Sequence, residues 1–435
     1  MLLPTPRAAS LAAAGLLVAL LALPWPRLGG AVLALDLLLL AAVAADALRA
    51  PRPGSLAARR GFADPMSAFA PAAVGLELAW RGSRAAFVRL ADAPPSSFES
   101  QGHRMEVLLP PRGEVALGYR VVPRSRGDFR FGDLHVRAAG PWGLAARQWR
   151  TELAAAVRVY PDLRGLARLD ASLAPGSAPS RRGGIPDGRE FEGLRPHLPG
   201  DDVRRVDWKA TARRGAPVVR EMGPERSQTV WLLLDCGRPL AGRLPGGRTR
   251  LDGAVDACLA LSRAATRGGD RVGLVAFGSE VRALVPPGRG SGQLGPLAAA
   301  LYGLDARPEE PCLSHALDLV QARQGRRALV VLFTDLTDPE SGAALVARAT
   351  LLCRRHLVLL VAPADPALSS AAASRPSSVE DAFARVAAAR ILAEREAALA
   401  RLRGTGVRVA DVAAGQSASA AALTGYASAK ASGRL

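Results

Sequence analysis

The sequence predicts three architectures in one chain of 435 residues: an N-terminal transmembrane helical hairpin, a small all-β sandwich domain and a doubly wound α/β domain. Three observations support this. Two apolar runs lie close together near the N-terminus, short alternating strands follow them, and the last part of the chain alternates continuous apolar strands with helical stretches. The boundaries expected are 1–60 for the hairpin and its basic flank, 61–162 for the β domain, 163–228 for a linker with a charged segment, and 229–435 for the α/β domain.

The N-terminal runs are Ser10–Leu23 and Ala31–Leu48, and the short loop between them contains Trp25. Each run is near the lower length limit for a spanning helix, and the loop is too short to cross a bilayer, so a helical hairpin is expected. A cleaved signal peptide is the alternative, because Arg7 precedes a short apolar core. It is disfavoured because a second apolar run follows at once.

Charges around the runs predict the orientation of the hairpin. The loop between the runs holds one arginine, Arg27, whereas four follow the second run: Arg49, Arg52, Arg59 and Arg60. The positive-inside rule then places both ends and the soluble domains in the cytoplasm, with the hairpin in the inner (cytoplasmic) membrane. Asp36 is either an intramembrane functional carboxylate or a residue near the outer interface.

Residues 61–162 consist of short runs with two-residue alternation, separated by Pro-Pro, Arg-Gly and Gly-Asp turns. This spacing is typical of a small all-β sandwich. No catalytic constellation is evident, since His103 and His135 stand alone. Residues 164–188 are rich in Gly, Pro, Ser and Arg and are expected to form a linker or surface loop.

From residue 229 onward, buried strands and amphipathic helices alternate, which indicates a mostly parallel sheet. The expected strands are Thr229–Asp235, Arg271–Phe277, Val281–Val285, Ala328–Asp335, His356–Val361 and Val407–Val412. The expected helices are Leu251–Arg267, Gln293–Leu304, Leu313–Gln324, Pro339–Arg354, Val379–Arg403 and Ser417–Ala431. Two of the strands end in Asp235 and Asp335, so both carboxylates are predicted at the carboxyl edge of the sheet, where such folds bind ligands.

Composition bears on several classes of function. The formal net charge is +18, but aromatic residues make up only 5% and acids interrupt the arginines, so nucleic-acid binding is not expected. The four cysteines are widely spaced without a C-x-x-C pair and are predicted to be reduced core thiols. No phosphate-loop or G-x-S-x-G motif is present, and no enzyme is predicted. A metal-dependent hydrolase cluster of His197, Asp201, Asp202 and Asp207 is a less favoured alternative, because only one histidine is available.

Two sets of residues resemble known families. The two strands ending in aspartate, with Thr334 before Asp335, resemble the von Willebrand factor A fold. The stretch from Glu190 to Arg213 resembles the signature of the domain-of-unknown-function 58 family, and so does the closing Tyr426–Lys430. The resemblance implies a MoxR-type AAA+ ATPase as protein partner. We therefore expect an adaptor or scaffold protein working in envelope-related assembly or maturation.

The signature stretch concentrates opposite charges around a Pro-Gly turn. Its candidate residues are Arg195, Asp201, Asp202, Arg204, Asp207, Trp208, Lys209 and Arg213. Two interpretations stay open: a docking surface for a partner, or a latch of bidentate ion pairs that fixes the linker against the A-type domain. Asp201 is expected to cap the turn that follows, and Trp208 is expected to anchor it to a core.

The A-type resemblance also implies a metal-ion-dependent adhesion site, which uses an Asp-x-Ser-x-Ser turn, a threonine and a later aspartate. This chain reads Asp235-Cys236-Gly237-Arg238-Pro239, so both hydroxyl ligands are missing, and only Asp235 and Asp335 remain. A hard cation such as Mg²⁺ needs more oxygen ligands. A metal-dependent ligand-binding domain is thus the alternative function. The favoured expectation is that both aspartates bind loop amides or pair with Arg238.

Overall fold

A computed structural model describes residues 1–63, 65–161, 190–199, 201–223, 228–244, 246–336, 339–413 and 415–432. The chain forms two compact units, Met1–Tyr160 and Pro161–Leu435. Residues 162–189, which include the whole predicted linker 164–188, lie outside the described residues.

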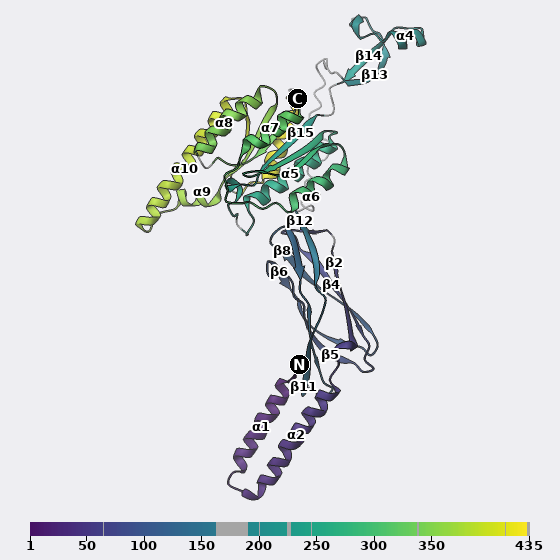
Figure 1. The fold of residues 1–435 in the computed structure, drawn as a ribbon, viewed down its shortest axis with the longest axis vertical. Coiled ribbons are helices and arrows are strands. Elements are labelled where there is room, and N and C mark those ends of the chain that lie inside the picture. The colour runs from purple at the N-terminus through teal and green to yellow at the C-terminus, as the bar shows by residue number, and fades with distance from the viewer. Residues whose placement is uncertain are drawn as a thin grey trace. The chain divides into compact units, whose positions relative to one another are not determined.

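The first unit begins with strand β1 (Leu2–Pro4), helix α1 (Pro6–Ala22) and helix α2 (Gly29–Arg49), and the two helices lie side by side (Figure 1). Among the described helices, α2 alone is long and apolar enough to cross a bilayer, whereas α1 has 17 residues. One apolar helix near an N-terminus serves as an anchor or as a signal, and it supports no multi-pass topology by itself. Asp36 faces the partner helix: a Cβ atom at Gly15 would lie 3.2 Å from its Oδ1 atom.

Both ends of the helical pair are tied to one turn of the β domain. Thr5 caps α1 and donates its hydroxyl to the carbonyl of Gly143 at 2.6 Å, and β1 pairs with strand β11. Asp46 is fully buried and accepts hydrogen bonds from the backbone amides of Trp142, Leu144 and Ala145 at 2.7–2.8 Å. An aspartate that the sequence presents as an interruption of an apolar run is therefore a structural joint.

The β domain is built mainly from antiparallel sheets, as predicted. Its strands are β2 (Leu56–Phe62), β3 (Met66–Ser67), β4 (Ala72–Trp80), β5 (Ala86–Ala91), β6 (Phe98–Gln101), β7 (Arg104–Leu109), β8 (Glu114–Pro123), β9 (Gly127–Phe131), β10 (Leu134–Ala139), β11 (Ala145–Thr151) and β12 (Ala155–Tyr160). They form sheets in the orders β1-β11-β10-β5-β7, β2-β4-β8-β6 and β3-β12-β9. Alternate residues face one core: β4 has a buried residue at every second position from Ala72 to Trp80.

One of the arginines assigned to membrane orientation has a different role. Arg60 lies on β2, its side chain is 1% exposed, and it forms a two-point ion pair with the buried carboxylate of Asp92. It also donates to the carbonyls of Leu153 and Gly132, at 2.7 and 2.9 Å. The hydroxyl of Tyr119 donates to the same carboxylate, and burial together with this bond raises the pKa of Tyr119. Arg60 is therefore a core residue, and the predicted boundary at 60/61 falls inside β2.

The charged segment before the α/β domain has its own secondary structure. Strand β13 (Glu190–Pro196) pairs antiparallel with strand β14 (Val218–Gly223), and between them lie the 3-10 turn η3 (Val203–Arg205) and helix α4 (Trp208–Arg214). We call residues 190–223 the signature module. Its strands were not predicted, because glycine, proline and charged residues hide the two-residue alternation.

The C-terminal region is the predicted mixed α/β fold with a mostly parallel sheet. Its strands are β15 (Thr229–Asp235), β16 (Arg271–Phe277), β17 (Val281–Gly288), β18 (Leu329–Phe333), β19 (Leu357–Pro363) and β20 (Arg408–Val412). The sheet order is β17-β16-β15-β18-β19-β20, and β17 alone of these six is antiparallel to its neighbour. All six strands coincide with expected ones to within a few residues.

Helices cover both faces of this sheet (Figure 1). They are α5 (Arg250–Arg267), α6 (Leu294–Tyr302), α7 (Leu313–Arg323), α8 (Pro339–Cys353), α9 (Pro366–Ala373), α10 (Val379–Gly404) and α11 (Ala418–Ala431). Helices α5, α6 and α11 pack on one face, and α7, α8 and α10 pack on the other. The four cysteines are free thiols, and Cys236 and Cys258 are buried.

The last helix is held by a buried carboxylate. Asp270, the residue just before β16, accepts a hydrogen bond from the hydroxyl of Tyr426 and pairs with the ammonium of Lys430 at 3.0 Å. Burial and the bond to Asp270 raise the pKa of Tyr426. Tyr426 and Lys430 therefore attach α11 to the residue that precedes β16.

Replacing Arg60 by alanine leaves the carboxylate of Asp92 buried without its cation. We expect the free energy of unfolding to fall by about 3–5 kcal/mol. The neighbouring Arg59→Ala is the matched control, because Arg59 is exposed on the other face of β2 and should change stability by about 0.5 kcal/mol or less. Denaturant unfolding of the purified chain measures both values, and equal losses would contradict the assignment.

Candidate functional site

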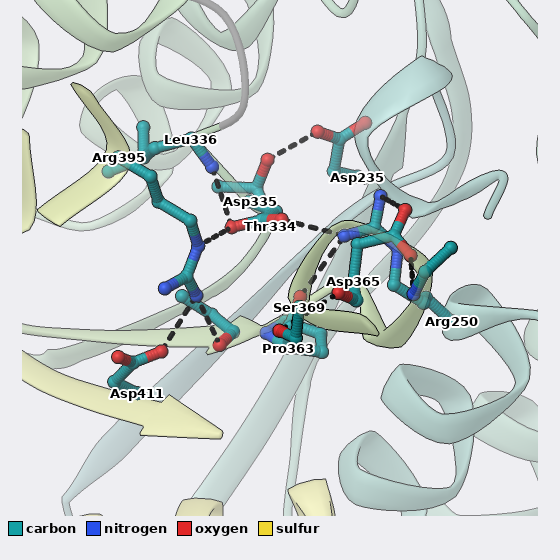
Figure 2. A network of polar contacts seen from close by, with 12 residues as sticks. Asp235, Arg250, Thr334, Asp335, Leu336, Pro363, Asp365, Ser369, Arg395 and Asp411 are labelled. Carbon is teal, nitrogen blue, oxygen red and sulfur yellow. Dashed lines mark hydrogen bonds and ion pairs between the residues drawn. The ribbon is translucent and has the colours of Figure 1, made fainter. Parts of the chain in front are cut away.

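The carboxyl edge of the parallel sheet brings the two predicted aspartates into one polar network (Figure 2). Asp235 ends β15 and is 1% exposed; it accepts hydrogen bonds from the amide of Gly237 at 2.7 Å and from the hydroxyl of Thr334. Thr334 and Asp335 directly follow β18, the neighbouring strand. The topology therefore places these side chains together, as the strand pattern predicted.

The environment of Asp235 disfavours its charged form. Burial raises the pKa of this carboxyl to about 6, and the negative charge of Glu310 acts in the same direction. The bonds from Thr334 and Gly237 oppose the shift without cancelling it. Asp235 is thus a carboxyl that changes charge close to neutral pH.

Asp335 lies between two buried arginines (Figure 2). Arg250 donates from Nη1 at 2.6 Å, Arg395 donates from Nε at 2.7 Å, and the amide of Leu336 donates at 2.8 Å. Both arginine residues are about 95% buried, at 4% and 5% exposure. Both carboxylate oxygens of Asp335 therefore accept hydrogen bonds from these donors.

Each arginine lies on a helix and donates further hydrogen bonds to other acceptors. Arg250 is the first residue of α5, whose start is fixed by a capping box of Thr249 and Asp252, and it also donates to the carbonyl of Pro363 at 3.2 Å. Arg395 lies on α10 and donates to Asp411 at 2.7 Å and to the carbonyl of Ala362 at 3.1 Å.

This donor set does not fit the metal site that the A-type resemblance implies. The oxygens of Asp335 face guanidinium and amide donors, and Asp235 faces an amide and a hydroxyl. Within the described part of the chain, no three His, Cys, Asp or Glu residues are grouped so as to hold a metal ion. The loop amides bind both aspartates as expected, but Arg238 pairs with Glu310 at 2.8 Å and not with either aspartate.

Sequence reasoning missed Arg250 and Arg395. A signal for Arg395 exists in the sequence, because it shares one face of α10 with Ala388, Leu399 and Leu402, all of which are buried. An arginine on the apolar stripe of a helix indicates a buried acidic partner. Arg250 offers no comparable signal, since it follows directly on a capping residue.

A pocket of about 570 Å³ opens beside Asp235. Its rim carries both charges, from Arg238 and Arg348 and from Glu310, and its wall includes Phe277 and Ser314.

In the signature module, the carboxylates bind groups of the module itself. Asp201 forms a two-point ion pair with Arg195, with one contact at 2.6 Å, and accepts the amide of Leu198 at 2.8 Å; the pair with Arg195 lowers the pKa of Asp201. Asp202 caps η3 by accepting the amide of Arg204 at 3.0 Å. The prediction that Asp201 caps the following turn is therefore wrong. Asp202 is the cap, because the carboxylate of Asp201 binds Arg195 and the amide of Leu198.

Asp207 has two functions in the same module. It caps α4 by accepting the amide of Ala210 at 3.0 Å, and it pairs with Arg220 of β14 at 2.8 Å. The hydrogen bond from Ala210, followed by that from Arg220, lowers the pKa of Asp207. This carboxylate therefore connects the helix to the hairpin.

Trp208 does not anchor the module to a core, because its side chain is 67% exposed. Among the module residues whose burial the structure describes, the buried ones are the valines at 206, 218 and 219. A two-stranded hairpin with a seven-residue helix has no second layer to cover an indole. Leu198 and Val203 are also exposed, at 60% and 63%. Five cations are exposed in the same module: Arg204, Lys209, Arg213, Arg214 and Arg220, the last of which pairs with Asp207.

These features define a two-unit chain with N-terminal antiparallel sheets, an apolar helix and a C-terminal α/β region preceded by a charged hairpin module. The family described as "Protein of unknown function DUF58" matches residues 193–390. This region, which includes most of the signature module and the sheet-edge residues Asp235, Arg250 and Asp335 but ends before Arg395 and Asp411, therefore belongs to the DUF58 family.

Known relatives are distant. An uncharacterized protein of Mycobacterium tuberculosis is 29% identical over 177 residues, which cover 40% of this chain and 54% of that protein. The uncharacterized protein YeaD of Bacillus subtilis is 26% identical over 159 residues, covering 34% of this chain and 39% of that protein. A solved structure of a Salmonella alpha-2-macroglobulin mutant matches 24% of this chain and 7% of its own, with 15% identity and a TM-score of 0.19. The chain thus spans about half the length of the mycobacterial relative.

Arg395→Ala is expected to lower the free energy of unfolding by about 3–5 kcal/mol, because Asp335 loses one of its two buried cations. Arg390→Ala is the control on the same helix: its pair with Glu394 is exposed and contributes about 0.5 kcal/mol or less. Thermal unfolding of both variants measures the difference. A loss of the same size in both would show that Asp335 does not depend on Arg395.

The raised pKa of Asp235 predicts a pH dependence. The folded chain binds an extra proton between about pH 4 and pH 6, so this group's contribution to the free energy of unfolding decreases as the pH rises through that window, by up to about 3 kcal/mol. Asp235→Asn removes the titration. The free energy of unfolding, measured with urea from pH 4 to pH 7, should decrease more steeply with pH for the original chain than for the variant. Equal pH dependence of the two would refute the prediction.

Proposed function

We propose that this chain is a membrane-anchored adaptor protein that docks a protein partner in the cytoplasm through its signature module. The proposed partner is a MoxR-type AAA+ ATPase acting in envelope-related assembly or maturation, as the family resemblance implies. The observation that carries the proposal is the exposed surface of the module, which combines apolar and cationic side chains, whereas Asp201, Asp202 and Asp207 bind within the module.

The anchor is proposed to be the hairpin α1–α2 in the inner membrane. Thr5 and Asp46 bind one turn of the β domain, so the start of α1 and the end of α2 emerge at the same place. A pair of helices tied in this way enters and leaves a bilayer on one side, together with the β domain. Arg49 and Arg52 at this end, against Arg27 in the far loop, favour the cytoplasmic side.

The C-terminal region is proposed to be a von Willebrand factor A-type domain that works without a metal. Support comes from its strand order with one antiparallel edge strand, and from Asp235 and Asp335 at the carboxyl edge. Arg250 and Arg395 supply positive charge at Asp335, where the adhesion-site alternative would need a cation. Metal-dependent ligand binding is accordingly the weaker proposal.

The surface chemistry of the signature module suits a protein partner. Exposed Trp and Arg side chains are typical of residues that dominate the energy of protein interfaces. A two-stranded sheet is marginally stable alone, so covering Trp208 and Val203 would stabilise the module itself. The hydrolase alternative receives less support, because Asp201 and Asp207 are engaged with Arg195 and Arg220.

A latch onto the A-type domain is the competing interpretation, and both predict burial of Trp208. They differ in what a substitution changes. Loss of a latch lowers the stability of the isolated chain, whereas loss of a docking residue lowers capture of the partner and leaves stability unchanged.

We expect Trp208→Ala combined with Lys209→Glu to reduce recovery of an AAA+ ATPase from native membranes by tenfold or more, because an interface aromatic and a complementary charge are lost. The matched control is Phe383→Ala with Arg385→Glu on α10, where Phe383 is 73% exposed. Affinity capture with and without ATP measures the effect.

Unchanged recovery in the double variant, or no AAA+ ATPase in any sample, would overturn the docking proposal. A melting temperature lowered in the signature-module variant alone would favour the latch.

A further inference from the structure

The base of the helical pair contains a strongly basic pocket of about 540 Å³. It is lined from three directions: by the start of α1, by the outer face of strands β5 and β10, and by the turn before β11. Three of its lining residues are arginines: Arg7, Arg89 and Arg137. Because all these elements belong to the unit Met1–Tyr160, the pocket is formed within one compact part of the chain.

Two of these arginines repel each other electrostatically, which destabilises the sheet. Arg137 of β10 lies directly opposite Arg89 of β5, and like charges in opposed positions are destabilising. Arg89 pairs with Glu106 of β7 at 2.7 Å, but this pair is more than half exposed on both sides. Among the described residues, Arg137 has no carboxylate partner, although it is half-buried. An anion in the pocket would relieve this repulsion.

Two further features direct positive charge at the same place. Arg7 stands on the first turn of α1 and packs over Gly143, where a Cβ atom would lie 3.1 Å from its Nη1 atom. Pro6, the first residue of that helix, lines the pocket, so the positive end of the helix dipole contributes as well. The pocket therefore gathers three guanidinium groups and a helix N-terminus.

The surroundings of the pocket match a membrane–water boundary. Trp142 is 49% exposed next to the pocket residue Pro141, and the guanidinium of Arg49 lies 4.9 Å from the centre of its ring. Phe87, which lines the pocket, is 43% exposed. Exposed aromatic rings beside arginines at the end of an apolar helix are typical of the headgroup level of a bilayer.

We propose that this pocket binds the phosphate headgroup of an anionic phospholipid, with Arg137 and Arg7 contacting the phosphate and Arg89 assisting from the adjacent strand. Guanidinium groups bind phosphate oxygens through paired, charge-assisted hydrogen bonds, and cytoplasmic leaflets offer such lipids at this depth. This inference rests on the proposed membrane anchoring of α1 and α2. A free phosphate has the same chemistry as the headgroup, so the experiment separates the two sources.

The test uses the full chain in neutral detergent and measures lipid retention by native mass spectrometry. The probes are phosphatidylglycerol, phosphatidylcholine and inorganic phosphate. We expect phosphatidylglycerol to bind at least tenfold more tightly than either of the others, Arg137→Gln to weaken it by tenfold or more, and Arg137→Lys to retain part of the affinity. Arg120→Gln, an exposed arginine on β8, is the matched control and should bind as the original chain does.

Equal binding of phosphatidylcholine, or full binding by Arg137→Gln, would overturn the lipid site. Inorganic phosphate binding as tightly as the lipid would overturn the assignment to a headgroup. Resistance of the chain to carbonate extraction from membranes is measured in parallel: a chain that is extracted refutes the anchor itself, whereas an embedded chain that lacks lipid preference refutes only the pocket. Unchanged thermal unfolding of Arg137→Gln shows that the variant is folded.

Discussion

The placement of Asp335 between Arg250 and Arg395 is the interaction on which the C-terminal region depends. Removing three charged groups from water is costly, and close ion pairs together with additional hydrogen bonds offset that cost, although the Nε atom of Arg250 is buried without a partner. Here the arginines also reach the carbonyls of Pro363 and Ala362 and the carboxylate of Asp411, so one buried acid connects β18, β19, β20, α5 and α10. Charged hydrogen bonds consequently cross-link the carboxyl edge of the sheet.

The same device recurs in the first unit. Asp92 binds Arg60 and Tyr119 within the β domain, and Asp46 binds three amides of one turn at the foot of α2. In each case a buried carboxylate collects donors that are distant in the sequence. A carboxylate with several fixed donors has low conformational freedom. We therefore assign these acids a structural role and look for partner-binding groups elsewhere.

How far the sequence predicts this protein depends on the range of the interaction. The strands of the C-terminal region were predicted because continuous apolar runs record burial locally, and Asp235 and Asp335 followed from the rule that parallel strands end at one edge. The partner of Arg60 is 32 residues away and that of Arg250 is 85 residues away, and no local pattern records such a pairing. The prediction that Trp208 is buried in a core is wrong for a different reason. Its apolar character favours burial, but the signature module is too small to cover it.

The net charge of +18 has a different meaning once the arginines are separated by environment. Arg60, Arg250 and Arg395 are consumed by buried acids and add nothing to an outer field. Exposed or half-buried cations that lack such acids are spread over the described chain, and they include those of the pocket at the start of α1 and those of the signature module. Long-range attraction depends on uncompensated charge, and the two proposals assign recognition to the cations of these two places. Under these proposals, the first place would hold the chain at an anionic bilayer and the second would face an acidic protein surface, so both would use the basic charge.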